Sequence, residues 1–180
     1  MHAPVPTAAG ATIRLEPMLA AREQRATRQA AVLARFDKPL VSVTVVTPGP
    51  VKDGRLPRQV LVEALQELEA VSGQRGWRVL SREVLWQDTG PEAIYVIDVD
   101  ARILKSTTVE LEELHPLGRL WDLDVIAPRQ GQLSRRDLGF PARRCLICDE
   151  PAHACARSRR HPLEELLETI GRIAHEHDLR

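Results

Sequence analysis

The sequence has few aromatic residues and no long apolar run. Only six of its 180 residues are Phe, Trp or Tyr although 43% are hydrophobic, so the core is expected to consist of Leu, Val, Ile and Ala. No run of about 18 apolar residues is present, which argues against a membrane-spanning helix. The N-terminus lacks the basic-then-apolar pattern of a secretory signal. We therefore expect a cytoplasmic protein with no membrane partner.

The chain also lacks a net charge, because 25 Lys and Arg residues balance 25 Asp and Glu residues. A neutral chain has no general attraction to nucleic acid or to membranes. The charge is unevenly distributed, however, since residues 129–161 contain eight Arg and three acidic residues, a local balance of 8 − 3 = +5. Such a segment suits phosphates or an acidic protein partner, or is a solvated surface. The scarcity of aromatics argues against stacking on nucleic-acid bases.

Cysteine is scarce as well, and its three copies lie within 11 residues of one another. Because disulfides rarely persist in the cytoplasm, the cluster suggests metal binding or packing rather than a crosslink. With a nearby histidine the spacing is C-x2-C-x6-C-x5-H, which offers four ligands for structural zinc. Buried free thiols, a redox CxxC and His175 or His177 as the fourth ligand remain alternatives. The ligands on this hypothesis are Cys145, Cys148, Cys155 and His161.

Hydrophobic periodicity predicts four helices and four strands, with the second and third strands paired antiparallel through a turn at 88–91. The order indicates an α+β fold, a two-layer sandwich with a β-α-β-β-α-β core whose sheet is covered by helices on one face. We expect one domain over 1–180, with a flexible lead-in at 1–14 and a Cys/His appendage at 143–161. The predicted helices are 16–35, 57–72, 101–114 and 162–177, and the strands are 40–47, 77–86, 93–99 and 120–127.

Side-chain orientations follow from the same periodicity. The apolar face of helix 101–114 is expected to contain Ile103, Leu104, Thr107, Leu111 and Leu114. In the first helix, arginines recur every three residues, and we expect them to be solvated, with a phosphate clamp as the alternative. These arginines are Arg22, Arg25 and Arg28.

The strand at 120–127 alternates carboxylates with bulky apolar residues. Successive side chains on a strand point to opposite faces, so Asp122 and Asp124 should project together, away from Trp121, Leu123 and Val125. Two such close charges repel each other unless a cation or a shared proton neutralises them. Mg²⁺ beside substrate phosphates is one solution, and two solvated acids on a half-exposed strand are the alternative.

Several motifs together resemble the CitX family, the holo-acyl-carrier-protein synthases of citrate lyase. The motifs are HPLGRLWDLDV at 115–125, SRRD at 134–137 and RRCLxC at 143–148, and the resemblance extends over roughly residues 15–175. It implies a nucleotidyltransferase-like or split βαβ core, and an enzyme that uses Mg²⁺. The implied reaction moves phosphoribosyl-dephospho-CoA from 2′-(5″-triphosphoribosyl)-3′-dephospho-CoA to a serine of the apo acyl carrier (gamma) subunit, with release of pyrophosphate.

The resemblance also suggests roles for residues. Asp122 and Asp124 would bind Mg²⁺, and His115 would accept the serine proton, although a structural role is the alternative for a His before Pro. Glu110 or Glu112 would be a third carboxylate, with a solvated helix face as the alternative. The expected phosphate ligands are Arg119, Arg135 and Arg136, followed by Lys52 in the loop after the first strand and Arg22.

Two other functions fit the same sequence. One is transfer to the related carrier of malonate decarboxylase, which shares the prosthetic group. The other is a non-catalytic, zinc-stapled binding module whose basic segment docks an acidic partner. Release of pyrophosphate separates the two classes, because a binding module releases none.

Overall fold

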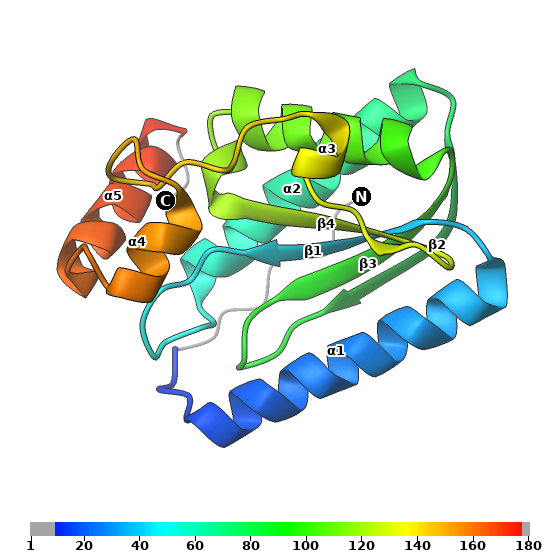
Figure 1. The fold of residues 1–180 in the computed structure, drawn as a ribbon. Coiled ribbons are helices and arrows are strands. Elements are labelled where there is room, and N and C mark those ends of the chain that lie inside the picture. Colours follow the sequence, from blue (N-terminus) through cyan, green and yellow to red (C-terminus); the bar gives the residue numbers. More distant parts are fainter. Residues whose placement is uncertain (1–9, 178–180) are drawn as a thin grey trace.

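A five-stranded antiparallel sheet in the order β2-β3-β1-β4-β5 organises the chain (Figure 1). The structure is a computed structural model, and it describes residues 10–177. The strands are β1 (Leu40–Val45), β2 (Arg78–Leu85), β3 (Glu92–Asp98), β4 (Trp121–Ala127) and β5 (Gly131–Gln132). The helices are α1 (Leu15–Phe36), α2 (Arg55–Gln74), α3 (Ala101–Leu114), α4 (Ala152–Ser158) and α5 (Leu163–Glu176), with single 3-10 turns η1 (Gly118–Leu120) and η2 (Arg136–Leu138).

The predicted α+β fold is confirmed, including the β-α-β-β-α-β order and the antiparallel pairing of β2 with β3. Each predicted helix and strand is present with its ends shifted by two residues or fewer. The short β5 and α4 were not predicted. A two-residue strand and a seven-residue helix contain too little of either period to be recognised from the sequence.

The main core lies between one face of the sheet and the helices α2 and α3. Strand alternation turns Val41 and Val43 of β1 toward this side, together with Trp121 of β4. The indole N–H of Trp121 donates to the Val60 carbonyl of α2 at 3.0 Å, which satisfies the one polar atom of this buried ring. Leu61 of α2 is fully buried against the same layer. The other face of β4 is left for polar side chains.

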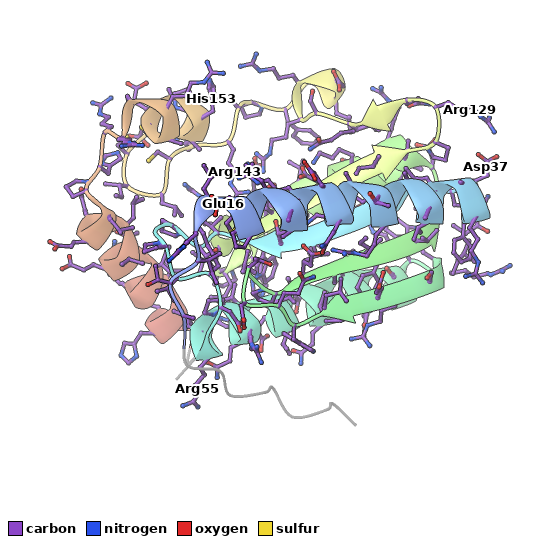
Figure 2. The ribbon with its side chains drawn as sticks, turned by 90° about the horizontal axis from the view of Figure 1, so that it is seen from below. Glu16, Asp37, Arg55, Arg129, Arg143 and His153 are labelled. Atoms are coloured by element: carbon purple, nitrogen blue, oxygen red, sulfur yellow. The ribbon has the colours of Figure 1, made fainter. Side chains whose placement is uncertain are left out.

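Helix α1 lies across the opposite face of the sheet (Figures 1 and 2). The expectation that helices cover only one face was therefore incomplete, because α1 adds a partial third layer. The physical reason is a second apolar cluster, in which Leu40, Ile94 and Val96 project from the sheet and need cover. Phe36 and Leu33 at the C-terminal end of α1 supply it.

The N-terminal half of α1 is held by charge rather than by apolar packing. The guanidinium groups of Arg25 and Arg28 both bind the carboxylate of Glu92, whose side chain is only 3% exposed. The expectation that these two arginines are solvated was therefore wrong. A buried carboxylate needs paired donors, and the three-residue spacing brings both arginines to it.

Within the predicted lead-in, residues 1–9 lie outside the described residues. Residues 10–14 run beside the loop that follows β1, where the Ile13 N–H donates to the Pro50 carbonyl at 2.9 Å. Thr12 forms an isolated bridge with Val51 in the same loop. None of the helices between residues 10 and 177 is long and apolar enough to cross a membrane.

Gly118 permits the close packing of η1 against the end of α3. A Cβ at this position would lie 2.3 Å from the Leu111 carbonyl oxygen and 2.6 Å from that of Glu112. We expect Gly118→Ala to lower the free energy of unfolding by about 2–3 kcal/mol, measured by urea denaturation. Gly73→Ala in α2 is the matched control, since its Cβ would meet no atom within 4 Å, and equal stability of the two variants would contradict this account.

Candidate active site

The carboxylates of Asp122 and Asp124 lie on the same face of β4, opposite the core. Asp122 is paired across the sheet with Thr44 of β1, and Asp124 is paired with Ser42. The Asp122 side chain is 53% exposed, whereas Asp124 is partly buried. The two acids thus open toward solvent on the face that α1 crosses, at the end of the sheet next to η1.

Electrostatics at this pair follows from its geometry. Burial raises the pKa of Asp124, and the neighbouring Asp122 carboxylate raises it further. Lys105 and a hydrogen bond with Gln132 oppose the shift. The folded chain therefore holds two repelling carboxylates in one place, and a divalent cation would relieve that repulsion.

Arg143 connects the pair to a buried glutamate. It lies in the segment between η2 and α4 and is labelled in Figure 2. Its Nη1 is 3.7 Å from an oxygen of Asp122 and 3.7 Å from one of Glu112, and its Nη2 donates to the Arg119 carbonyl at 2.7 Å. This guanidinium is therefore fixed at the edge of the acidic pair, with part of its surface still exposed.

Glu112 is buried, so the alternative of a solvated helix face was wrong for this residue. Glu110 does lie on the exposed face of the helix, where it pairs with Arg75. One Glu112 oxygen accepts from the Leu123 N–H at 2.7 Å, and the Lys105 amine donates to the Leu123 carbonyl at 3.2 Å. These two side chains supply the hydrogen bonds of the β4 backbone at Leu123, because β5 pairs with β4 only at Ile126 and Ala127.

The predicted apolar face of α3 was consequently wrong in part. Leu104 and Thr107 are buried as expected, but Ile103 is 49% exposed and Leu114 is 81% exposed. The helix is turned so that its polar residues reach the unpaired edge of β4, because unpaired backbone groups there would cost more than two exposed apolar side chains.

The predicted phosphate ligands fall into different environments. Arg135 pairs with Glu112 at 2.5 Å and with Glu113 at 2.7 Å, so its donors are already engaged, whereas Arg136 is exposed. Arg119 donates to the carbonyls of Arg144 and Cys145, and its Nε is buried with no partner within the described part of the chain. Arg119 thereby anchors the cysteine segment directly to η1.

Lys52 in the loop after β1 and Arg22 of α1 are near enough to influence each other electrostatically. The Lys52 amine donates to the Thr47 carbonyl at 2.6 Å in the loop after β1. Burial lowers the pKa of Lys52, and the nearby Arg22 lowers it further. Two adjacent cations of this kind would be relieved by an anion, and the structure does bring both predicted residues together.

The cysteine segment folds into a compact Cys3His cluster. The ligand atoms of the four predicted residues all lie within 4.8 Å of one another, so the cluster can hold a metal ion. The thiol of Cys148 is 3.6 Å from that of Cys155 and 3.3 Å from Nε2 of His161. Nδ1 of His161 faces Glu165 at 3.5 Å, an arrangement that orients the other ring nitrogen toward a metal. His177 instead contacts His115.

The thiols differ in their proton affinity. Burial opposes ionisation of Cys145, but hydrogen bonds from the backbone N–H groups of Ile147 and Cys148 lower its pKa to about 7. Burial, together with the neighbouring thiols, raises the pKa of Cys155 to about 11. Three thiols at such short range cannot all ionise without a cation, which is the condition that a metal ion satisfies.

The chain matches known proteins over almost its whole length. The CitX family, described as apo-citrate lyase phosphoribosyl-dephospho-CoA transferase, matches residues 13–177. A protein of that name from Citrobacter koseri is 44% identical over 166 residues, covering 92% of this chain and 91% of its own length. One from Escherichia coli O6:K15:H31 is 40% identical over 178 residues, covering 99% and 97%. The chain belongs to the CitX family.

In this CitX-family chain, sequence reasoning missed Arg143 and Lys105, and it named Glu112 only as a possible third metal carboxylate, not as a partner of the β4 backbone. Arg143 was noticed only as part of a motif, because its role depends on a fold-back of the segment after β4. A signal for the other two was present, since Lys105 and Glu112 are seven residues apart and share a helical face with buried Thr108. Charged residues at such spacing indicate a polar face of the helix that contacts polar groups of another element.

His115 is placed away from the acids of the CitX-family motif. Its ring stacks on Trp121 with centroids 4.4 Å apart, and its Nδ1 accepts from the Leu117 N–H at 3.1 Å. Trp121 points to the core face, opposite Asp122 and Asp124. The structure thus supports the structural alternative for His115 and does not bring it to the acidic pair as a proton acceptor.

We therefore expect His115→Phe to keep transfer activity within about threefold while losing about 1 kcal/mol of stability with the Nδ1 acceptor. Burial lowers the pKa of His115 in the folded state. The unfolded chain then takes up a proton at a higher pH than the folded chain does, so the stability of wild type should fall as pH drops below 6.5. This pH-dependent loss of stability should be absent in the variant. Urea denaturation at several pH values measures it; a large loss of transfer in a folded variant would contradict the assignment.

Proposed function

We propose that this protein transfers the phosphoribosyl-dephospho-CoA group from 2′-(5″-triphosphoribosyl)-3′-dephospho-CoA to a serine of the apo acyl carrier subunit of citrate lyase. A bond forms between the serine oxygen and the innermost phosphorus of the triphosphate, the bond to pyrophosphate breaks, and the serine proton is released. The observation that carries the proposal is the pair Asp122 and Asp124 on one open face beside Arg143, in a chain of the CitX family.

Asp122 and Asp124 would hold Mg²⁺. They fit this ion because both offer carboxylate oxygens on one face and because burial, together with the Asp122 carboxylate, raises the pKa of Asp124. Bound there, the ion would supply positive charge against the triphosphate and the departing pyrophosphate. The protein's own contribution is to hold both acids on β4, whose residues 121–126 are paired with β1 and whose open edge is bonded at Leu123 by Glu112 and Lys105.

Nearby cations would position the phosphates. Arg143 presents its guanidinium 3.7 Å from Asp122, fixed by the Arg119 carbonyl. Lys52 in the loop after β1 and Arg22 of α1 would form a second cationic group. Charge-assisted hydrogen bonds from such groups hold a polyanion and neutralise the charge that develops on the leaving group.

We also propose that Cys145, Cys148, Cys155 and His161 hold a structural zinc ion. Three thiols and one imidazole nitrogen complete a tetrahedral set, which leaves no position for substrate. The ion would tie the ends of the segment 145–161 together. Because Arg119 binds the carbonyl of Cys145, this tie also fixes the segment from which Arg143 projects.

The acidic carrier would dock on the basic segment. Arg157, Arg159 and Arg160 are exposed on and after α4, beside the cysteine cluster. Arg129, in contrast, is paired with Asp37 at the far end of α1 (Figure 2). Opposite charges on the two partners accelerate their encounter, so the apparent KM for the carrier should rise with ionic strength.

The intact mass of the apo carrier after incubation with this protein, Mg²⁺ and the triphosphate donor tests the proposal directly. We expect a mass increase equal to phosphoribosyl-dephospho-CoA and an equal amount of released pyrophosphate. Carrier subunits from citrate lyase and from malonate decarboxylase, assayed side by side, determine which acceptor is used. An unmodified carrier and no pyrophosphate would leave only the binding-module function.

A further inference from the structure

Two adjoining cavities lie between the loop after β1 and the helices α4 and α5. The larger has a volume of about 830 Å³, and the smaller one is about 240 Å³. Val46, Pro48, Gly49 and Leu163 line both cavities, so the two cavities adjoin, and we refer to them together as the groove.

The larger cavity is strongly cationic. Four arginines line it, and none of the residues that line it is acidic. Arg144 also contacts Asp149, but that acid is 97% exposed and lies outside the lining. Burial, together with the neighbouring arginines, lowers the pKa of Arg119, which shows that positive charge is crowded here. The lining arginines are Arg119, Arg143, Arg144 and Arg159.

The smaller cavity is almost entirely apolar. Its walls include Leu56 and Val60 of α2, Leu120 of η1, and Leu167 and Ile170 of α5. The one acidic side chain in its lining belongs to Asp53, whose carboxylate is bound by Arg58 at 2.5 Å. An extended, weakly polar chain would bury apolar surface here, whereas a phosphate would find no cationic side chain in these walls.

The order of these features along the molecule is informative. Arg143 lines the cationic cavity and its Nη1 is 3.7 Å from an oxygen of Asp122, so this arginine links the cavity to the acidic pair. Along the surface of the molecule, the carboxylate pair is therefore followed by the arginine-lined cavity and then by the apolar cavity. The donor has the same order of groups, with a triphosphate, two riboses, the diphosphate of dephospho-CoA and finally the pantetheine arm.

We infer that the arginine-lined cavity binds the diphosphate of the dephospho-CoA moiety and that the apolar cavity receives its pantetheine arm. The inference rests on the proposed function, which supplies the donor. It places the transferred group on the α4 and α5 side of the acidic pair. Charge complementarity selects the diphosphate, and the adjacency of the two cavities selects the arm attached to it.

Binding of dephospho-CoA and of ADP, measured by calorimetry without carrier or triphosphate, tests this placement. The two probes share the adenosine diphosphate, and only the first has the pantetheine arm. Wild type should bind dephospho-CoA about tenfold more tightly than ADP, a difference of about 1.4 kcal/mol. Leu167→Asp, which puts a charge into the apolar cavity, should remove this preference and leave the affinity for ADP unchanged.

Matched controls are available for both cavities. Ile103→Asp changes a residue with the same exposed fraction as Leu167, 49%, outside the groove, and it should keep the preference. Arg144→Gln combined with Arg159→Gln should weaken both probes about tenfold. Arg157→Gln, two residues before Arg159 in sequence but outside the lining, should change the affinity for neither probe.

Equal wild-type affinity for the two probes, or a preference that survives Leu167→Asp, would overturn the pantetheine assignment. Unchanged affinities in the double arginine variant would overturn the diphosphate assignment. Asp122→Asn separates these failures from failure of the proposed function, because it should bind dephospho-CoA like wild type yet modify no carrier. If wild type modifies carrier but either binding result fails, the function stands and only the placement is lost.

Discussion

Asp122→Asn and Asp124→Asn should each lower the rate of carrier modification by about a thousandfold or more. Asparagine keeps the size and shape of the side chain but removes one of the two charges that would hold the divalent cation. Without the cation, the negative charge on the departing pyrophosphate has no adequate counterion at this edge of the sheet. The rate is measured from the intact mass of the carrier over time with Mg²⁺ at saturation.

The same variants should remain folded, and this distinguishes loss of chemistry from loss of structure. Burial raises the pKa of Asp124 and repulsion by Asp122 raises it further, so in the absence of metal the removal of either charge should leave the variants at least as stable as wild type. An acid with a raised folded pKa costs stability at neutral pH, and the cost disappears as pH falls toward 3.8. Wild type should therefore gain stability on mild acidification relative to Asp124→Asn.

Transfer at near the wild-type rate by either folded variant would contradict the metal role of the pair. Ser42→Ala is a suitable neighbour control, because Ser42 lies opposite Asp124 on β1 and bonds Gln29 of α1 rather than either acid. We expect the transfer rate of that variant to stay within about threefold of the wild-type rate. The variant loses one hydrogen bond outside the acidic pair, worth about 0.5–1.5 kcal/mol of stability.

Loss of the metal from the cysteine cluster should have the second large effect. We expect Cys148→Ser and His161→Ala to be isolated with little zinc, and the segment 143–161 to become sensitive to proteolysis. Structural zinc supplies about 10–16 kcal/mol of apparent binding free energy in small domains, far more than the few contacts of this segment can replace. Transfer should fall by about a hundredfold, because Arg143 and Arg119 lose the scaffold that fixes them.

The control is His153→Ala, which changes an exposed histidine of the same segment outside the cluster (Figure 2). It should keep the metal, the protease resistance and the activity. Elemental analysis of protein purified without chelator gives the zinc content directly. A content below about a tenth of an equivalent in wild type would contradict a zinc site. Full activity in zinc-free Cys148→Ser would contradict its link to the acidic pair.

The sequence by itself determined the local structure and the chemistry of two sites. Alternation along 121–125 placed Asp122 and Asp124 on one face, because side-chain direction on a strand depends only on position. The order of helices and strands specified the α+β core. The spacing of Cys145, Cys148 and Cys155 sufficed to bring their thiols together with His161, because few residues separate the ligands.

The tertiary structure alone decided which distant groups meet these sites. Arg143 reaches Asp122 only because the segment after β4 folds back, and Glu112 is buried only because β4 has an unpaired edge there. His115 stacks on Trp121, so it lies on the opposite face of the sheet from the acids. The groove between the β1 loop and α5 joins residues more than 100 positions apart. Such contacts depend on how whole elements pack, and no local period in the sequence encodes that.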